Sequence, residues 1–370
     1  MKRHDADEFL ADLNRAIELN PGDAEAIAKR GHIYLEMKRY DQALADYTRA
    51  IELDPGNARA IHGRGETYRL MERYDEALAD LNRAIELSPG YAGAIADRGQ
   101  VYAAMKRYDE ALADLNRAIE LSPGDPWALA GRGETYRLMK RYEEALADHS
   151  RAIELNPRHT WAIANRGRVH AAMKRYDEAL ADYSRAIELN PGYAGAIANR
   201  GGVYAAMKRY DEALADLNRA IELSPGDAWR LAGRGETYRL MERYEEALAD
   251  LNRAIELNPG DARAIASRGD TYRWMKRYDE ALTDLNRAIE LDPGDAWAIA
   301  SRYLVNKRMK RHDEARADRS RAIELDPGYP YAIARDRVIT AMKRYGRALA
   351  GLKRGLKLIF SDRALRDRDP

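Results

Sequence analysis

The sequence has 370 residues, a length that would ordinarily hold two or three domains but that a single array of repeats can also reach. Its residues are 45% hydrophobic and 33% charged, which excludes an intrinsically disordered chain. The 62 Lys and Arg residues nearly equal the 61 Asp and Glu residues, so the net charge is close to zero. The absence of cysteine excludes disulfides, thiolate metal sites and a cysteine nucleophile.

The first residues, 1–8, lack the apolar stretch of a signal peptide, and no run of the sequence approaches membrane-spanning length. We therefore expect a soluble, cytoplasmic protein with no membrane partner.

A period of 34 residues organises the chain. It is marked by Pro-Gly pairs that begin at Pro21, Pro55, Pro89, Pro123, Pro191, Pro225, Pro259, Pro293 and Pro327, and Pro157 with Arg158 fills the one gap. Turn signals in strict register indicate a stack of similar supersecondary units. Residues 1–23 precede the first complete unit and are expected to form a lone N-terminal helix, either a half repeat or a cap.

Eight regular units are expected over 24–293, each made of two antiparallel helices. In the unit that starts at Asn57, small and apolar residues recur at helical spacing on both sides of a break at Glu72-Arg73. Pro89-Gly90 is expected to end the second helix, with the glycine in the left-handed conformation. N-caps are predicted at Asn57, Asp125, Asp227, Asp261 and Asp295.

Residues 91–157 and 193–259 are near copies, with seven differences over 67 positions. This predicts duplication of a three-repeat block, by recent expansion or by engineering. Neighbouring stretches of surface would then be similar, which favours an extended or repetitive ligand.

The last two units depart from the pattern. Residues 294–327 are expected to form a degenerate ninth unit, with Tyr303 in place of the small glycine and Asn306 in place of the tyrosine. Residues 328–370 are expected to form a degenerate final unit with a basic C-terminal helix, which is either a cap or a docking site. Residues 301–370 hold 19 basic and 9 acidic residues, so nucleic-acid binding there stays an alternative that the overall charge does not favour.

The repeat resembles the tetratricopeptide repeat. The family's spaced pattern is matched by Ile61, Arg64, Gly65, Tyr68, Ala77, Leu81, Ala84 and Pro89, and it recurs along essentially the whole chain. The resemblance implies an all-α, right-handed superhelical solenoid whose first helices line a concave groove, in which partner peptides usually lie.

One departure from the family is systematic. Arginine replaces the common leucine at Arg30, Arg64, Arg98, Arg132, Arg166, Arg200, Arg234, Arg268 and Arg302. Each arginine is followed sixteen residues later by an aspartate, from Asp46 to Asp318. We predict a ladder of Arg–Asp pairs between the two helices of each repeat, because a half-buried guanidinium needs a carboxylate. The alternative is that these arginines extend into solvent.

Candidate ligand-binding residues are those that vary on the predicted groove face. They are Arg59, Glu66, Arg69, Trp127, Glu134, Arg137, Trp161, Asn165, Arg168, Asn199, Trp229, Glu236, Arg239, Arg263, Asp270, Arg273, Trp274 and Trp297. Units with Ala103-Ala104 leave room, whereas units with Arg69-Leu70 or Arg137-Leu138 add bulk. Such a surface suits a peptide with acidic and apolar side chains. The tryptophans could instead pack between adjacent repeats.

The family's carboxylate clamp for chaperone C-termini is not expected here. Asn165 and Asn199 match its central asparagine, but neighbours such as Ala130 and Gly195 do not match the rest. No catalytic, metal-binding or cofactor-binding motif is present. His149 and His170 are expected to form a hydrogen-bonded structural pair.

The sequence therefore predicts a non-enzymatic scaffold that binds a protein or an extended peptide. Two other readings stay open: a regulatory or sensor module excised from a larger bacterial signalling or defence protein, and a designed or duplicated repeat protein without a natural ligand. Self-association is a further alternative.

Overall fold

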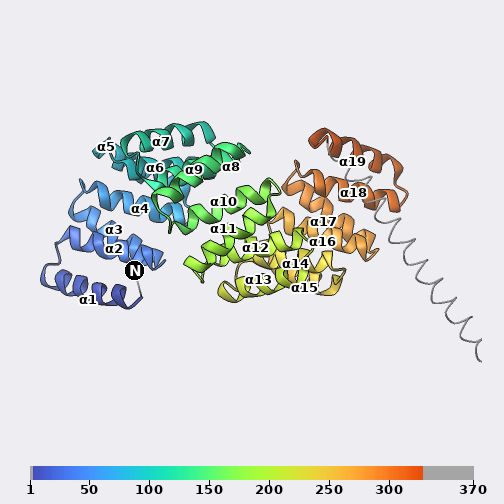
Figure 1. The fold of residues 1–370 in the computed structure, drawn as a ribbon, viewed down its shortest axis with the longest axis horizontal. Helices are drawn as coiled ribbons and strands as arrows, with labels where there is room; N and C mark the ends of the chain where they lie inside the picture. The colour runs from blue at the N-terminus through green and yellow to red at the C-terminus, as the bar shows by residue number, and fades with distance from the viewer. Residues whose placement is uncertain (1–2, 328–370) are drawn as a thin grey trace, which may run out of the picture. The chain divides into compact units, whose positions relative to one another are not determined.

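The computed structural model describes residues 3–327, and all of their regular structure is α-helical. The all-α repeat fold expected from the sequence is confirmed, because short turns join the helices into antiparallel pairs (Figure 1). Backbone contacts divide the chain into two compact units, Met1–Val203 and Tyr204–Pro370. Residues 328–370, with the predicted final repeat and basic C-terminal helix, lie outside the described residues.

The first unit holds α1 (Arg3–Leu19), α2 (Ala24–Glu36), α3 (Tyr40–Leu53), α4 (Ala58–Leu70), α5 (Tyr74–Leu87), α6 (Ala92–Ala104), α7 (Tyr108–Leu121), α8 (Pro126–Leu138), α9 (Tyr142–Leu155), α10 (Thr160–Ala172) and α11 (Tyr176–Leu189). The unit boundary falls within α12 (Ala194–Ala206). The second unit holds α13 (Tyr210–Leu223), α14 (Ala228–Leu240), α15 (Tyr244–Leu257), α16 (Ala262–Trp274), α17 (Tyr278–Leu291), α18 (Ala296–Arg308) and α19 (His312–Leu325). No helix among the described residues is long and apolar enough to cross a membrane.

The turn inside each repeat uses a left-handed residue that is not glycine. Glu72, between α4 and α5, has φ 60°, and eight further Lys or Glu residues at the same repeat position have φ between 58° and 65°. By contrast, no glycine among the described residues has a positive φ. The expectation that Gly90 adopts the left-handed conformation is therefore wrong, and the Pro-Gly turn reverses the chain without it.

Side-chain caps start many of the first helices, as the sequence predicts. The side-chain oxygen of Asn57 accepts a hydrogen bond from the Ala60 amide, and Asp261 does the same for Ala264. The predicted caps at Asp125, Asp227 and Asp295 are likewise confirmed. Each cap satisfies a backbone donor that the first turn of a helix leaves free.

Glycines that recur at one position of the repeat allow the two helices of a repeat to approach closely. A Cβ atom added at Gly99 would lie 2.8 Å from the Leu115 side chain and 3.1 Å from the Ala111 carbonyl oxygen. At Gly269 it would lie 2.9 Å from Leu285. At these two positions the close packing of the helix pair leaves no room for a side chain.

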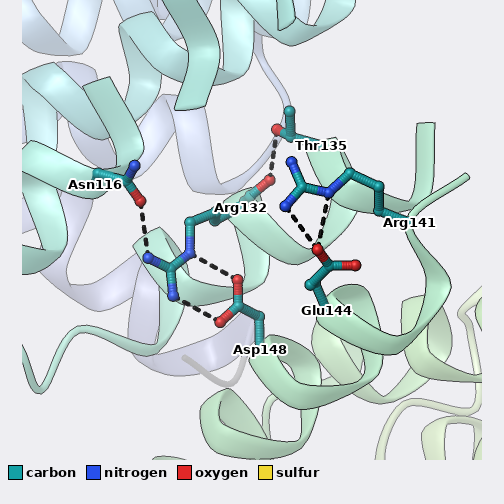
Figure 2. Close-up of polar contacts among 7 residues, drawn as sticks. Asn116, Arg132, Thr135, Arg141, Glu144 and Asp148 are labelled. Carbon is teal, nitrogen blue, oxygen red and sulfur yellow. Dashed lines mark hydrogen bonds and ion pairs between the residues drawn. The ribbon is translucent and has the colours of Figure 1, made fainter. Parts of the chain in front are cut away.

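The predicted Arg–Asp ladder is present. Figure 2 shows one rung, in which Arg132 Nε and Nη2 donate to the two carboxylate oxygens of Asp148 at 2.7 and 2.8 Å. Seven other predicted pairs have the same two-pronged geometry, namely those of Arg30, Arg64, Arg98, Arg166, Arg234, Arg268 and Arg302. The aspartates are buried and their arginines are largely covered, so the solvent-exposed alternative does not hold.

The same arginines also join successive repeats. Arg132 Nη1 donates to Asn116 Oδ1 at 2.8 Å, so one guanidinium on α8 bridges α9 and α7 (Figure 2). A second link comes from Arg117 Nη2, which donates to the Pro89 carbonyl oxygen at 2.8 Å and ties α7 to the turn before its own repeat. The ladder therefore connects three successive helices, which the spacing of sixteen residues alone did not indicate.

The ninth repeat keeps its helix pair despite its unusual residues. Arg302 on α18 bonds Asp318 on α19, and Asn306 Nδ2 donates to the same aspartate at 2.9 Å. Tyr303 is buried where other repeats have glycine. Regular ladder geometry thus extends to the end of the described chain.

Candidate functional site

The first helices form one continuous face within the first unit. Consecutive first helices α2, α4, α6, α8 and α10 contact one another, and no comparable contact links consecutive second helices in the described part of this unit. The first helices therefore lie on the inner side of the stack, where most of the predicted ligand-binding residues are located.

This inner face is hollowed by a pocket of about 230 Å³. Its lining comes from α4, the start of α5, α6, α8 and α10: Arg69, Tyr74, Gln100, Ala103, Ala104, Gly131, Glu134, Leu138 and Trp161. Ala103 and Ala104 leave the space that bulkier residues occupy in neighbouring repeats. Three predicted residues, Arg69, Glu134 and Trp161, thus meet at one hollow.

Aromatic rings gather where α8 and α10 begin. The rings of Trp127 and Trp161 are stacked, with centroids 6.3 Å apart and an interplanar angle of 21°. His159, the residue before α10, lies 4.0 Å from the Trp127 ring centroid and is buried. Trp127 remains 56% exposed, so its contacts with the next repeat leave much of the side chain uncovered.

Glu134 in the pocket wall accepts hydrogen bonds from Arg137 and Arg168. Arg137 Nε and Nη2 donate to the two Glu134 carboxylate oxygens at 2.7 and 2.8 Å, and Arg168 Nη1 donates to Oε1 at 3.2 Å. Burial by itself would raise the pKa of Glu134, but the Arg137 hydrogen bonds and the charges of both arginines lower it. Arg168 also donates to Asn165 Oδ1 at 3.1 Å. Both arginines are therefore held by one acid of the chain itself, Glu134.

A polar cluster that the sequence analysis missed lies beside the pocket. His62 Nε2 lies 2.7 Å from Asp97 Oδ2, His62 Nδ1 lies 2.9 Å from Tyr91 Oη, and Arg69 Nε lies 3.4 Å from Asp97 Oδ1. Burial lowers the pKa of His62, but the hydrogen bond to Asp97 and the charges of Asp97 and Glu66 together outweigh it, so the pKa is raised. His62 replaces an alanine that each of the next seven repeats carries at this position, which is the signal that could have revealed it.

Potential metal ligands come together in this cluster. Ligand atoms of His62, Glu66 and Asp97 all lie within 4.8 Å of one another, a set that could hold a divalent cation. Arg69 already supplies positive charge to both carboxylates, at 3.4 Å from Asp97 and 3.9 Å from Glu66. The hydrogen bonds and ion pairs within the cluster therefore neutralise its charged side chains without a metal ion.

In the second unit a buried acid links two predicted arginines. Asp270 Oδ1 accepts from Arg273 at 2.6 Å and Oδ2 accepts from Arg239 at 3.1 Å. Burial would raise the pKa of Asp270, yet the charges of Arg273 and Arg239 lower it. Glu236 similarly accepts from Arg263 at 3.3 Å, and Arg273 lies over the ring of Trp274.

The other predicted residues differ in exposure. Trp229 is 48% exposed, whereas Trp297 packs against the buried core of α16–α18, as the alternative interpretation of the tryptophans predicts. Arg59 is exposed, Asn199 is half-buried and Asn165 is buried.

The predicted histidine pair is wrong. His170 Nδ1 lies 3.0 Å from Asp182 Oδ2, where Asn306 makes the equivalent contact in the ninth repeat. His149 is completely buried against Gly133, and neither of its ring nitrogens has a hydrogen-bond partner. Each histidine is accommodated by its own repeat.

Sequence comparison matches this chain to one family. Models described as "Tetratricopeptide repeat" match residues 24–57, 46–79, 65–132, 126–159, 161–193, 193–259 and 262–295. No curated protein sequence matches the chain.

Solved structures share the fold at low sequence identity. The APC/C hetero-tetramer Cut9-Hcn1 matches with a TM-score of 0.62 and 16% identity, over 86% of this chain and 79% of that chain. A tetratricopeptide repeat protein from Parabacteroides merdae matches with a TM-score of 0.54 and 20% identity, over 67% of this chain and 98% of that chain.

Proposed function

Because the chain belongs to the tetratricopeptide repeat family, we propose that it is a non-enzymatic scaffold that holds an extended segment of a partner protein along its first helices. The observation that carries this proposal is the 230 Å³ pocket on the inner face of the first unit, beside the exposed ring of Trp127. A hollow lined by small residues and flanked by tryptophan is a surface to which a peptide can anchor.

The ion pairs on the first helices limit which partner side chains can bind there. The groove arginines Arg137, Arg168, Arg239 and Arg273 all bond to acids of the chain. An acidic partner would have to compete with these pairs, whereas apolar side chains need no such exchange. We therefore propose a partner that binds mainly through apolar contacts, with polar backbone contacts along the helix faces.

Selection from a displayed library of random linear peptides tests this function. We expect selected peptides to bind the purified full chain and to lose affinity when Trp127 and Trp161 are both replaced by alanine. The matched control is Trp297→Ala, which removes a tryptophan that packs against the core. Failure to select any peptide, or equal loss with the control variant, would overturn the proposed site.

A further inference from the structure

The pocket of the first unit has a shape and chemistry that indicate one class of side chain. We propose that it receives a neutral aromatic side chain, phenylalanine or tyrosine, of the bound segment. This inference rests on the proposed function, because it names the residue that the groove selects.

The charges in the wall argue for a neutral occupant. Glu134 is neutralised by Arg137 and Arg168, and Arg69 lies between Asp97 and Glu66. A charged side chain buried beside these pairs would find no free counter-charge and would have to break an existing pair. A neutral side chain leaves the network intact.

The remaining wall residues favour a ring over an aliphatic chain. Ala103, Ala104 and Gly131 form a low wall against which a flat ring can lie. Trp161 and Tyr74 provide ring surfaces for stacked or edge contacts, and the Arg69 guanidinium can face an aromatic ring. The volume of about 230 Å³ is more than a valine or leucine side chain fills.

The duplicated block supplies a natural comparison of sequence. The residues that lie 102 positions after Arg69, Gln100 and Trp161 are Ala171, Gly202 and Arg263, whereas Tyr74, the two alanines and Glu134 are retained. Arg69, Gln100 and Trp161 are therefore the wall residues that distinguish this pocket from the equivalent positions later in the array. This pattern predicts a single aromatic preference rather than one that repeats along the array.

Amino-acid amides test the pocket directly. We would titrate the ¹⁵N-labelled full chain with N-acetyl-phenylalaninamide, N-acetyl-tyrosinamide, N-acetyl-leucinamide and N-acetyl-alaninamide and follow the Trp161 indole N–H signal, assigned with Trp161→Arg. The aromatic amides should bind at least about tenfold more tightly than the alanine amide and more tightly than the leucine amide.

A pair of variants identifies the binding location. Ala104→Leu fills the pocket with the residue that other repeats carry at Leu70, Leu138 and Leu240, so the fold should tolerate it. Ala172→Leu makes the same change at the equivalent position outside the pocket. The first variant should weaken the aromatic amides by about tenfold, and the second should leave their affinity unchanged. Thermal melting of both variants verifies folding.

Each outcome has a defined meaning. Equal affinity for phenylalanine and leucine amides, or indifference to Ala104→Leu, would overturn the aromatic pocket. If displayed peptides bind at the Trp127 face without a recurring aromatic residue, the scaffold stands and this inference fails. If aromatic amides bind but no peptide is selected, the pocket chemistry stands and the proposed function fails.

Discussion

His149 replaces a hydrophobic residue inside the core of the fourth repeat. Its imidazole packs against Gly133, and the near copy of this repeat carries Leu251 at the same position. The pKa of His149 is lowered to about 4, chiefly by burial and with added effects of the Arg137, Arg166 and Arg168 charges, while the Glu134 charge opposes the shift. The ring is therefore neutral at pH 7, with two nitrogens that lack partners.

We predict that His149→Leu stabilises the chain and removes a pH dependence. The unfolded chain binds a proton near pH 6.5, whereas the folded chain binds it only near pH 4, so stability falls as the pH drops between these values. The shift corresponds to about 3 kcal/mol over that window. Urea unfolding at pH 7 and pH 5 measures it.

The reverse change is the control for that prediction. Leu251→His in the near copy should introduce a comparable acid sensitivity, since Leu251 is also fully buried. Identical pH profiles of the His149→Leu variant and the parent chain would contradict the assignment of the proton to this residue.

Single residues show where prediction from the sequence stops. The N-caps and the Arg–Asp ladder were predictable because each depends on residue type at a fixed spacing within one period. The contacts of His62 with Tyr91 and Asp97 were not, because they span 29 and 35 residues and recur nowhere else in the described array. A residue that departs from the repeat pattern, such as His62 where other repeats have alanine, indicates a local contact that the repeat pattern does not predict.

At the scale of elements, the turn inside each repeat carries the backbone strain. Lys106 has φ 63°, a conformation that costs an L-residue about 1–2 kcal/mol, whereas no glycine in the described Pro-Gly turns has a positive φ. The sequence suggested the opposite, because glycine is the residue most often found in left-handed turns. The position of the residue in the repeat sets the left-handed conformation, and Lys or Glu adopts it there despite the steric cost.

We predict that exchanging these residue types improves stability. Lys106→Gly should stabilise the protein by about 0.5–1 kcal/mol, since glycine adopts the left-handed conformation without the side-chain clash. Gly124→Ala should be neutral or stabilise by up to about 1 kcal/mol, because an added Cβ meets no atom within 4 Å. Thermal unfolding measures both, and a loss of stability in either variant would contradict this account of the turns.

At the scale of the whole molecule, the ladder couples neighbouring repeats within each unit. Arg132 contacts α7 and α9 from α8, so its loss affects two repeats at once (Figure 2). The family most often has leucine at the position of Arg132, whereas in this chain the Arg132–Asp148 ion pair joins the helices there.

We predict that Arg132→Ala destabilises the chain by about 3 kcal/mol, because it leaves the buried Asp148 carboxylate unpaired. Removing both partners in Arg132→Ala, Asp148→Ala should cost less than removing the arginine alone. Arg141→Ala is the matched control: its exposed pair with Glu144 should change stability little. Urea unfolding of the three variants checks the order, and an equal effect of Arg141→Ala would contradict it.

The candidate binding residues illustrate what a repeat sequence can and cannot predict. The periodic fold places every candidate residue on a first helix, and the gap at Ala103-Ala104 was predictable from side-chain size. The neutralisation of the arginines was not, because Arg168 reaches back 34 residues to Glu134 and Arg239 reaches forward 31 residues to Asp270. Such pairs depend on side-chain orientation across helices, which spacing does not determine.

The measurement that tests the central claim most directly is hydrogen–deuterium exchange of the full chain with and without a selected peptide. If the inner face of the first unit holds the peptide, the peptide should slow exchange in α4, α6, α8 and α10 and leave the second helices α7 and α9 unchanged. Protection confined to the second helices, or no protection in the first unit at all, would contradict the claim.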